Sequence, residues 1–185
     1  MKILKLAIYM AFITLISSLL LFKINTLTSP IIKESEQKKE KMAFNELIPK
    51  ASKFETLNYK TENTKSISKA ISSKGETIGY ILKVYSKGYA DNIILLVGIA
   101  EQKITGISIL SQNETPGLGA LATSPKKMPG NAFSFLEQFI NKTLSSDFTA
   151  KKDIIAITGA TITSQAICDG IKTALIEYQK FVETN

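Results

Sequence analysis

The feature that most constrains this chain is an uncharged apolar run near its amino terminus. It extends from Leu6 to Phe22, 17 residues without a charged side chain. A helix that crosses a membrane needs about 17–25 such residues. A cleaved signal peptide is the competing interpretation, but it requires a small-x-small cleavage site, and the residues that follow Phe22 offer none. The run therefore predicts an uncleaved transmembrane anchor over residues 1–28.

The rest of the sequence has room for one ordinary domain and lacks the residues for several kinds of chemistry. All 23 basic residues are lysines, histidine is absent, and Cys168 is the single cysteine. Ser-His-Asp and Cys-His nucleophilic sites, histidine-rich metal sites, cysteine-ligated iron–sulfur clusters and an internal disulfide are thereby excluded. The net charge of +7 comes from scattered lysines, and arginine, the residue best suited to bidentate phosphate and guanine contacts, is missing. We therefore predict no nucleic-acid partner.

A charged, helix-prone stretch follows the anchor and separates it from the domain. It extends from Ile31 to about Phe54, and Pro30 suits the first position of a helix. Pro49 is expected to end or bend that helix. The organisation predicted is an anchor over 1–28, a stalk helix over 29–60 and a domain over 61–185.

The domain begins with a change to a period of two and to β-branched residues, from about Ser66. Four strands are expected, over residues 66–72, 77–86, 92–100 and 104–111. Their short connections predict an antiparallel meander. The run Ile93–Val97 is apolar on both faces, which predicts a central, covered strand.

Residues 112–130 are loop-like, with several prolines and glycines. A short helix over 132–141 and a strand over 153–157 are expected next. The last element is a helix with one buried stripe, and Cys168 on it is expected to be a small core or boundary residue. The stripe consists of Ile167, Ile171, Leu175, Tyr178 and Val182. The fold class predicted is α+β: the two amino-terminal helices, then an antiparallel sheet packed with helices.

The segment from Thr158 to Ser164 concentrates small and hydroxyl-bearing residues between an expected strand and the last helix. Unpaired amides and the positive dipole end of a helix start favour a phosphate there. The amides of Thr163, Ser164 and Gln165 are the expected donors. Simple capping by Thr163 or Ser164 is the alternative.

The segment from Glu114 to Gly119 is the second unusual stretch. Pro116-Gly117 fits positions i+1 and i+2 of a type II turn, and Gly119 eases a second bend. Such a loop also lets a flat ligand lie against backbone, with an acceptor at Glu114 and a hydroxyl at Thr115. A Pro-Gly turn alone would indicate no function.

Together, in this order and at this spacing, the two segments resemble the signatures of the covalent FMN-binding domain. That domain occurs in the G subunit of the Rnf electron transport complex and in the C subunit of the sodium-pumping NADH:quinone reductase. The resemblance also includes the anchor, the stalk and Gly88-Tyr89 before the central strand. The length of the chain is closer to that of the Rnf protein.

The resemblance implies that a separate flavin transferase joins FMN, through its phosphate, to the hydroxyl of Thr161. It implies an FMN domain outside the cytoplasm, a cytoplasmic amino terminus, and other subunits of the Rnf-type complex as partners. One departure is that the family motif has Asp three residues before its opening Ser/Thr, where this chain has Ile155, with Asp153 two residues earlier. The remaining FMN-binding residues implied are Thr158, Gly159, Ala160, Thr163, Ser164, Glu114, Thr115, Leu118 and Gly119.

Three hypotheses remain open on the sequence. The first is an Rnf-type flavoprotein subunit that couples ferredoxin and NAD redox to ion translocation, with either sodium or protons as the ion. The second is a free-standing, membrane-anchored FMN carrier. The third is an extracytoplasmic binding or scaffold module without flavin, in which both motifs are only turns.

Overall fold

The computed structural model describes residues 2–184 and divides into two compact units, Met1–Lys39 and Glu40–Asn185. Helix α1 (Lys2–Leu47) forms the first unit as far as Lys39, where it exposes large apolar side chains along most of its length, and its last turns belong to the second unit. This helix is long and apolar enough to cross a membrane. It continues without a break through Pro30, so the expectation of a separate stalk helix that starts there and extends to Phe54 is wrong. The helix ends at Leu47, two residues before Pro49.

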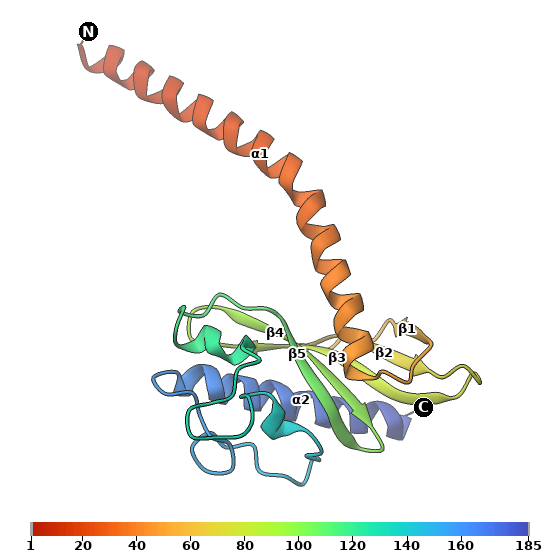
Figure 1. Cartoon of the computed structure of the whole chain (residues 1–185). Coiled ribbons are helices and arrows are strands. Elements are labelled where there is room, and N and C mark those ends of the chain that lie inside the picture. The colour runs from red at the N-terminus through yellow and green to blue at the C-terminus, as the bar shows by residue number, and fades with distance from the viewer. Residues whose placement is uncertain (1, 185) are drawn as a thin grey trace. The chain divides into compact units, whose positions relative to one another are not determined.

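The second unit is built on a five-stranded antiparallel sheet with the order β1-β2-β3-β4-β5 (Figure 1). Each strand pairs with its neighbours in the sequence, which confirms the predicted meander. The alternation of apolar and polar residues located four of the strands, and a fifth, β1, precedes them. The strands are β1 (Lys53–Leu57), β2 (Thr64–Ile71), β3 (Thr77–Lys87), β4 (Asn92–Ala100) and β5 (Lys103–Ser111).

Both faces of the sheet are covered, because successive residues of its inner strands point to opposite sides. On one face Ile81 and Leu96 pack with Ala43 and Leu47 from the end of α1. An ion pair of 2.7 Å between Lys83 Nζ and Glu40 Oε2 fastens this end of the helix to β3. Strand β4 has a strand on either side and is apolar on both faces, as predicted for a central, covered strand.

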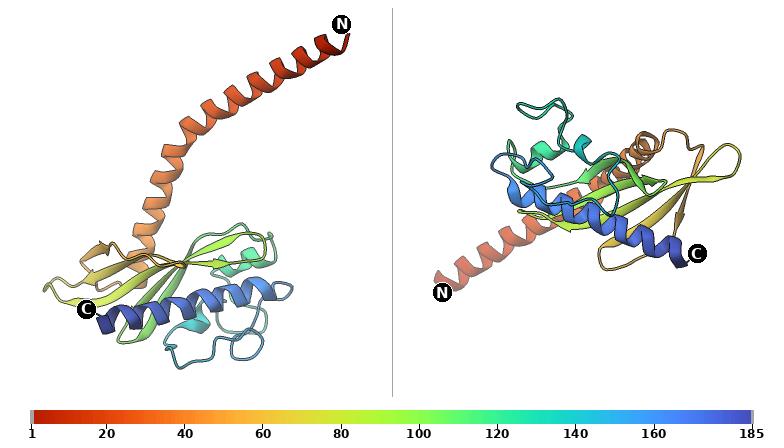
Figure 2. Two further views of the ribbon diagram at one scale, coloured as in Figure 1. Left: turned by 180° about the vertical axis from the view of Figure 1, so that it is seen from behind. Right: turned by 90° about the horizontal axis from the view of Figure 1, so that it is seen from below.

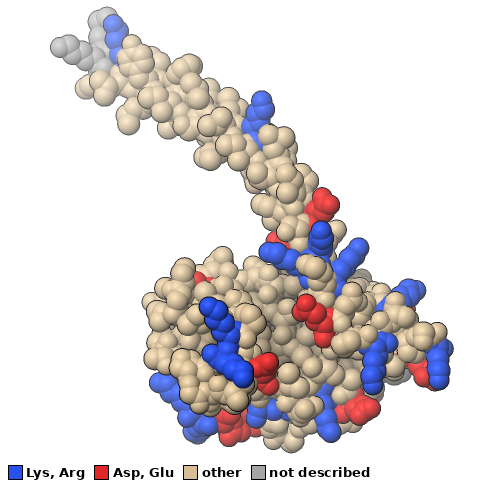
Figure 3. All heavy atoms as spheres, viewed as in Figure 1, with Lys and Arg blue, Asp and Glu red and all other residues tan. Residues whose placement is uncertain are grey.

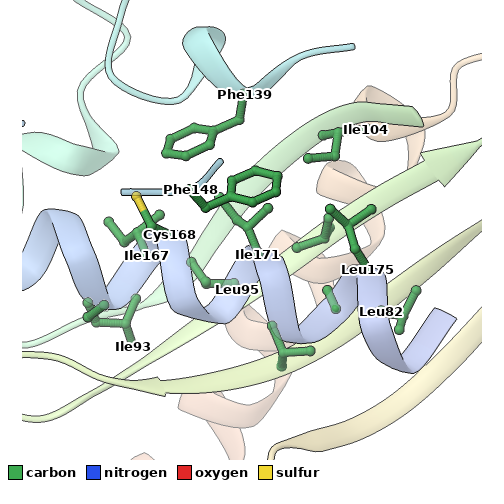
Figure 4. Close-up of a cluster of buried hydrophobic side chains, with 14 of the residues drawn as sticks. Leu82, Ile93, Leu95, Ile104, Phe139, Phe148, Ile167, Cys168, Ile171 and Leu175 are labelled. Atoms are coloured by element: carbon green, nitrogen blue, oxygen red, sulfur yellow. The ribbon is translucent and has the colours of Figure 1, made fainter. Parts of the chain in front are cut away.

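The other face carries the main core, under the carboxyl-terminal helix α2 (Thr161–Thr184), which packs against β3 and β4 (Figure 2). Ile167, Ile171 and Leu175 of its apolar stripe are buried against the sheet (Figure 4). The prediction fails at the end of the stripe, where Val182 is 47% exposed and Phe181 is buried instead. The helix turns Phe181 toward the sheet, where its ring packs against Tyr59 and Tyr80.

Cys168 lies in this core and is fully buried, which confirms its prediction as a core residue. Burial raises the pKa of its thiol to about 12, so the thiol is neutral at any physiological pH.

Between β5 and α2 the chain is mostly irregular. The helix expected over 132–141 is wrong, since only Glu137–Phe139 forms one 3-10 turn. The strand expected over 153–157 is also wrong, because the segment makes a single bridge between Ala150 and Ile154. This region nevertheless supplies core residues, and the rings of Phe135, Phe139 and Phe148 pack together.

Candidate functional site

Both sequence motifs line one pocket of about 500 Å³ at the amino-terminal end of α2. Such a volume lies within the range of small-molecule sites, roughly 300–1,000 Å³. The motif from Glu114 to Gly119 and the motif from Thr158 to Ser164 are 39 residues apart in the sequence, counted from Gly119 to Thr158. Of the ten predicted binding residues, all but Thr158 and Ser164 line the pocket.

The first motif forms the turn that its sequence predicts. The amide of Leu118 donates to the carbonyl of Thr115 at 3.1 Å, and Gly117 has φ of +77°. These are the features of a type II turn with proline at i+1 and glycine at i+2. The turn leaves Thr115 and Leu118 exposed at the pocket while Gly119 is buried beneath them.

The second motif makes a similar turn that delivers the chain into α2. The amide of Ala160 donates to the carbonyl of Ile157 at 3.0 Å, and Gly159 has φ of +75°. A side chain on Gly159 would also approach Leu118 Cδ2 to 2.9 Å, so the two motifs meet closely here. Helix α2 starts directly after this turn, at Thr161, which is half-buried at the pocket wall.

The first turn of α2 brings backbone amides without helical acceptors to the pocket. The amide of Ser164 is not one of them, because it donates to the carbonyl of Ala160 at 2.9 Å. The expectation that Ser164 would offer its amide is therefore wrong, and Gln165 lies one residue further into the helix. The amides without helical acceptors are instead those of the first turn, from Thr161 to Thr163.

The hydroxyls of this turn are used for purposes other than helix capping. Thr163 Oγ1 donates to Glu114 Oε2 at 2.5 Å and so joins the second motif to the first. Ser164 is fully buried; its hydroxyl accepts from the amide of Ile157 and donates to the carbonyl of Ala160. In the hydrogen bonds described for residues 2–184, neither hydroxyl caps an amide of the first turn of α2.

Two pocket residues were not among the predicted binding residues. Tyr89 is 70% exposed and Ile162 is 58% exposed, and both line the pocket. Exposed apolar side chains beside a concave site are typical of ligand surfaces. Tyr89 belongs to the connection from β3 to β4. The pair Gly88-Tyr89 was part of the family resemblance, and this was the available signal, although neither residue was predicted to bind the ligand. Ile162 is apolar but lies outside the predicted buried stripe of α2. This position was the available signal that its side chain does not face the core.

A second hollow of about 440 Å³ adjoins the site and shares Gly159 and Thr161 with it. Thr158 and Ile155 line this hollow rather than the main pocket. The backbone of Ile155 is held by Gln138, which accepts from its amide at 2.9 Å and donates to its carbonyl at 3.2 Å. Asp153 is exposed and lines neither cavity.

The other features described for the domain surface do not combine residues of both motifs. A larger hollow of about 620 Å³ lies beside Tyr178 and Val182, in the carboxyl-terminal half of α2, and contains no residue of either motif. Within residues 2–184 no cluster of three or more His, Cys, Asp or Glu side chains is placed to hold a metal ion. In the view of Figure 3, lysines and acidic side chains alternate over the domain without an extended patch of one sign.

Comparison with known proteins identifies a matching domain family and several relatives of this chain. Residues 88–176, which contain both motifs, match the FMN-binding domain family. The chain is 34% identical to the G subunit of the proton-translocating ferredoxin:NAD(+) oxidoreductase complex of Clostridium ljungdahlii, over 90% of this chain and 86% of that protein. It is 31% identical to the G subunit of the Na(+)-translocating ferredoxin:NAD(+) oxidoreductase complex of Acetobacterium woodii, over 95% and 91%. It is 30% identical to the G subunit of an ion-translocating oxidoreductase complex of Methanosarcina acetivorans, over 94% and 93%.

Proposed function

Since this chain belongs to the family of G subunits of ion-translocating oxidoreductase complexes and contains their FMN-binding domain, we propose that it is the membrane-anchored flavoprotein subunit of such a complex. It relays electrons through an FMN held in the pocket between the two motifs. The observation that carries the proposal is the convergence of both motifs on one pocket at the start of α2.

The pocket suits the two chemically different ends of FMN. The amides and positive dipole end of α2 favour the anionic phosphate. Tyr89, Leu118 and Ile162 offer exposed apolar surface for a flat ring. Gly119 keeps the pocket wall close, because a side chain there would come within 2.7 Å of Thr163 Oγ1.

Thr161 is the proposed attachment point, through an ester between its hydroxyl oxygen and the FMN phosphate. It is the first residue of α2, it is half-buried, and it lines both adjoining cavities. A separate flavin transferase makes the ester from an activated diphosphate form of FMN: the new P–O bond to Thr161 forms as the anhydride P–O bond to the leaving phosphate group breaks, and the hydroxyl proton of Thr161 is released. The protein then holds the cofactor permanently, which suits a carrier that works where free FMN is scarce.

When bound, the isoalloxazine ring supplies the redox chemistry, and the chain supplies position and environment. Thr163 and Glu114 hold the first turn of α2 against the loop of the first motif. The turn of the first motif presents Thr115 and Leu118 to the ligand. Of the remaining predicted contacts, Ser164 supports the turn before α2 from outside the main pocket, and Thr158 is exposed in that turn and lines the adjoining hollow.

We also propose how the subunit is placed in the cell. Residues 1–28 anchor it in the inner membrane with the amino terminus in the cytoplasm and the FMN domain outside, and the other subunits of the Rnf-type complex are its partners. The helix is long and apolar enough for this role. The coupling ion is left as sodium or proton, because the relatives named above include one complex of each kind.

The test is covalent flavin labelling. The full chain is expressed with a matching flavin transferase, separated under denaturing conditions and examined for flavin fluorescence. We expect a fluorescent band for the unmutated chain, none for Thr161→Ala, and a band for Thr158→Ala, which removes an exposed hydroxyl from the same turn.

An unlabelled native chain would refute the flavoprotein proposal and favour a binding module without flavin. Label that persists in Thr161→Ala would move the attachment to another hydroxyl, with Thr163 or Thr158 the first to test. Genes for the other Rnf subunits beside this one support a role in the complex, and their absence would favour a free-standing carrier.

A further inference from the structure

We infer that Glu114 is a positioning residue, whose buried carboxylate clamps together the three segments that surround the pocket and thereby holds Thr161 in place for flavin attachment. The inference deepens the proposed function and depends on it for the attachment step. It changes the predicted role of Glu114, which was an acceptor for the ligand.

Both carboxylate oxygens of Glu114 are already engaged by the protein. Oε1 accepts from the amide of Ala90 at 3.1 Å, and Oε2 accepts from the hydroxyl of Thr163 at 2.5 Å. The residue is 5% exposed, so little of it remains for a ligand. Hydrogen bonds to a carboxylate are among the stronger ones in proteins. The side chain is therefore fixed at both oxygens.

The segments that it joins are far apart in the sequence and all line the pocket. Ala90 follows Tyr89 in the connection from β3 to β4, and Thr163 lies in the first turn of α2 with Thr161. Glu114 itself opens the first motif. Its own amide donates to Gln112 Oε1 at 2.6 Å, which fixes the backbone from which the carboxylate extends.

Two glycines leave room for the carboxylate where any side chain would collide with it. A Cβ on Gly88 would overlap Glu114 Oε1 and would lie 2.8 Å from the carbonyl oxygen of Asp91. A Cβ on Gly119 would lie 2.8 Å from Glu114 Oε2 and 2.7 Å from Thr163 Oγ1. Neither glycine has a positive φ, so close packing rather than backbone conformation accounts for glycine at both positions.

The charge of the clamp is balanced by dipoles rather than by a lysine. The salt bridges of the described residues are Lys83 with Glu40 and Lys180 with Glu177, and neither involves Glu114. The donors on Glu114 are an amide and a hydroxyl, beside the positive end of α2. Glutamine could keep both contacts, because its oxygen can face the Ala90 amide while its NH₂ group donates to the Thr163 hydroxyl. Alanine loses both.

The first experiment measures the clamp without flavin, by amide hydrogen exchange on the full chain in detergent. In Glu114→Ala the amide of Ala90 should exchange at least about tenfold faster, because a hydrogen bond to a charged group is lost. In Glu114→Gln it should stay within about threefold of the unmutated chain. The matched control is Glu76→Ala, which removes an exposed carboxylate from the turn between β2 and β3. Unchanged exchange at Ala90 in Glu114→Ala would overturn the clamp.

The second experiment measures the rate of covalent flavin attachment by the transferase. Glu114→Ala should slow it about tenfold or more, because small displacements of a reacting group reduce rates strongly, whereas Glu114→Gln should restore it. Thr163→Val should slow it and Thr163→Ser should not, and this pair decides the question if Glu114→Ala does not fold. Equal rates for valine and serine at 163, or for alanine and glutamine at 114, would overturn the positioning role. A native chain that takes no flavin would refute the proposed function, while exchange at Ala90 would still decide the clamp.

Discussion

Gly119→Ala tests whether close packing beneath the first motif matters as the structure indicates. The added methyl would lie 2.7 Å from Thr163 Oγ1 and 2.8 Å from both Cβ and Oε2 of Glu114. The Cβ of Glu114 is one bond from its backbone and cannot swing away. Either the loop shifts or the contact between Glu114 and Thr163 breaks.

The expected cost follows from these two routes. Forcing an extra methyl into a packed site costs about 1–3 kcal/mol. Losing a hydrogen bond to a charged group costs about 1.5–3 kcal/mol. Since the two terms overlap, we expect the free energy of unfolding to fall by about 3 kcal/mol. With a urea slope of about 2 kcal/mol/M, the midpoint of unfolding should fall by about 1.5 M.

Gly117→Ala in the same loop is the matched control. Its Cβ would meet nothing within 4 Å, but its φ is +77°, so alanine there costs only the backbone strain of about 1–2 kcal/mol. The assay is urea unfolding of the full chain in detergent, followed by near-ultraviolet circular dichroism of the tyrosines. If Gly119→Ala costs no more than Gly117→Ala, the packing argument is wrong.

Three further predictions concern the core and its surroundings. Because burial raises the pKa of Cys168 to about 12, its thiol should not react with iodoacetamide at pH 8 until urea unfolds the chain; rapid alkylation of the native chain would contradict this. Phe139→Ala should lower the free energy of unfolding by about 3–5 kcal/mol, because it empties a fully buried site beside Phe148, and a loss under 1 kcal/mol would show that the site collapses. Burial alone raises the pKa of Glu177, but hydrogen bonds from Lys180 and Tyr59 outweigh it and leave the pKa below its ordinary value of 4.5. The stabilisation is therefore present above about pH 4.5 and lost as the pH falls through the lower folded pKa; Tyr59→Phe should reduce this dependence in unfolding titrations, and an unchanged pH profile would refute the coupling.

The sheet was predictable because alternation of apolar and polar residues is a local signal. Strands β2 to β5 were each located within two residues at either end. Strand β1 was missed because Lys53–Leu57 is an edge strand with no fully buried residue, and so its sequence does not alternate clearly. The helix expected over 132–141 was wrong because apolar residues in this segment, such as Phe135 and Phe139, enter the core from irregular backbone. Their presence was therefore no evidence of a helix.

The sequence predicted most of the residues that line the candidate site, but it did not predict how these residues contact one another. Glycine at positions 117 and 159 is a direct sequence signal of the two turns, because each turn requires a residue with positive φ at that position. The contact between Glu114 and Thr163 could not be read from the sequence, since it depends on how α2 crosses the sheet. Tyr89 could not be placed in the pocket either, because it reaches the site from the far end of β3.

The meander also sets the order in which the molecule can be completed. Each strand pairs with the one just made, so the sheet needs only neighbouring segments. The pocket needs residues 88–90, 114–119 and 159–163 at once, and the last of these follow all five strands in the chain. A chain that stops before Thr161 contains every strand and no complete pocket. Occupancy of the site would thus report that synthesis has passed the start of α2.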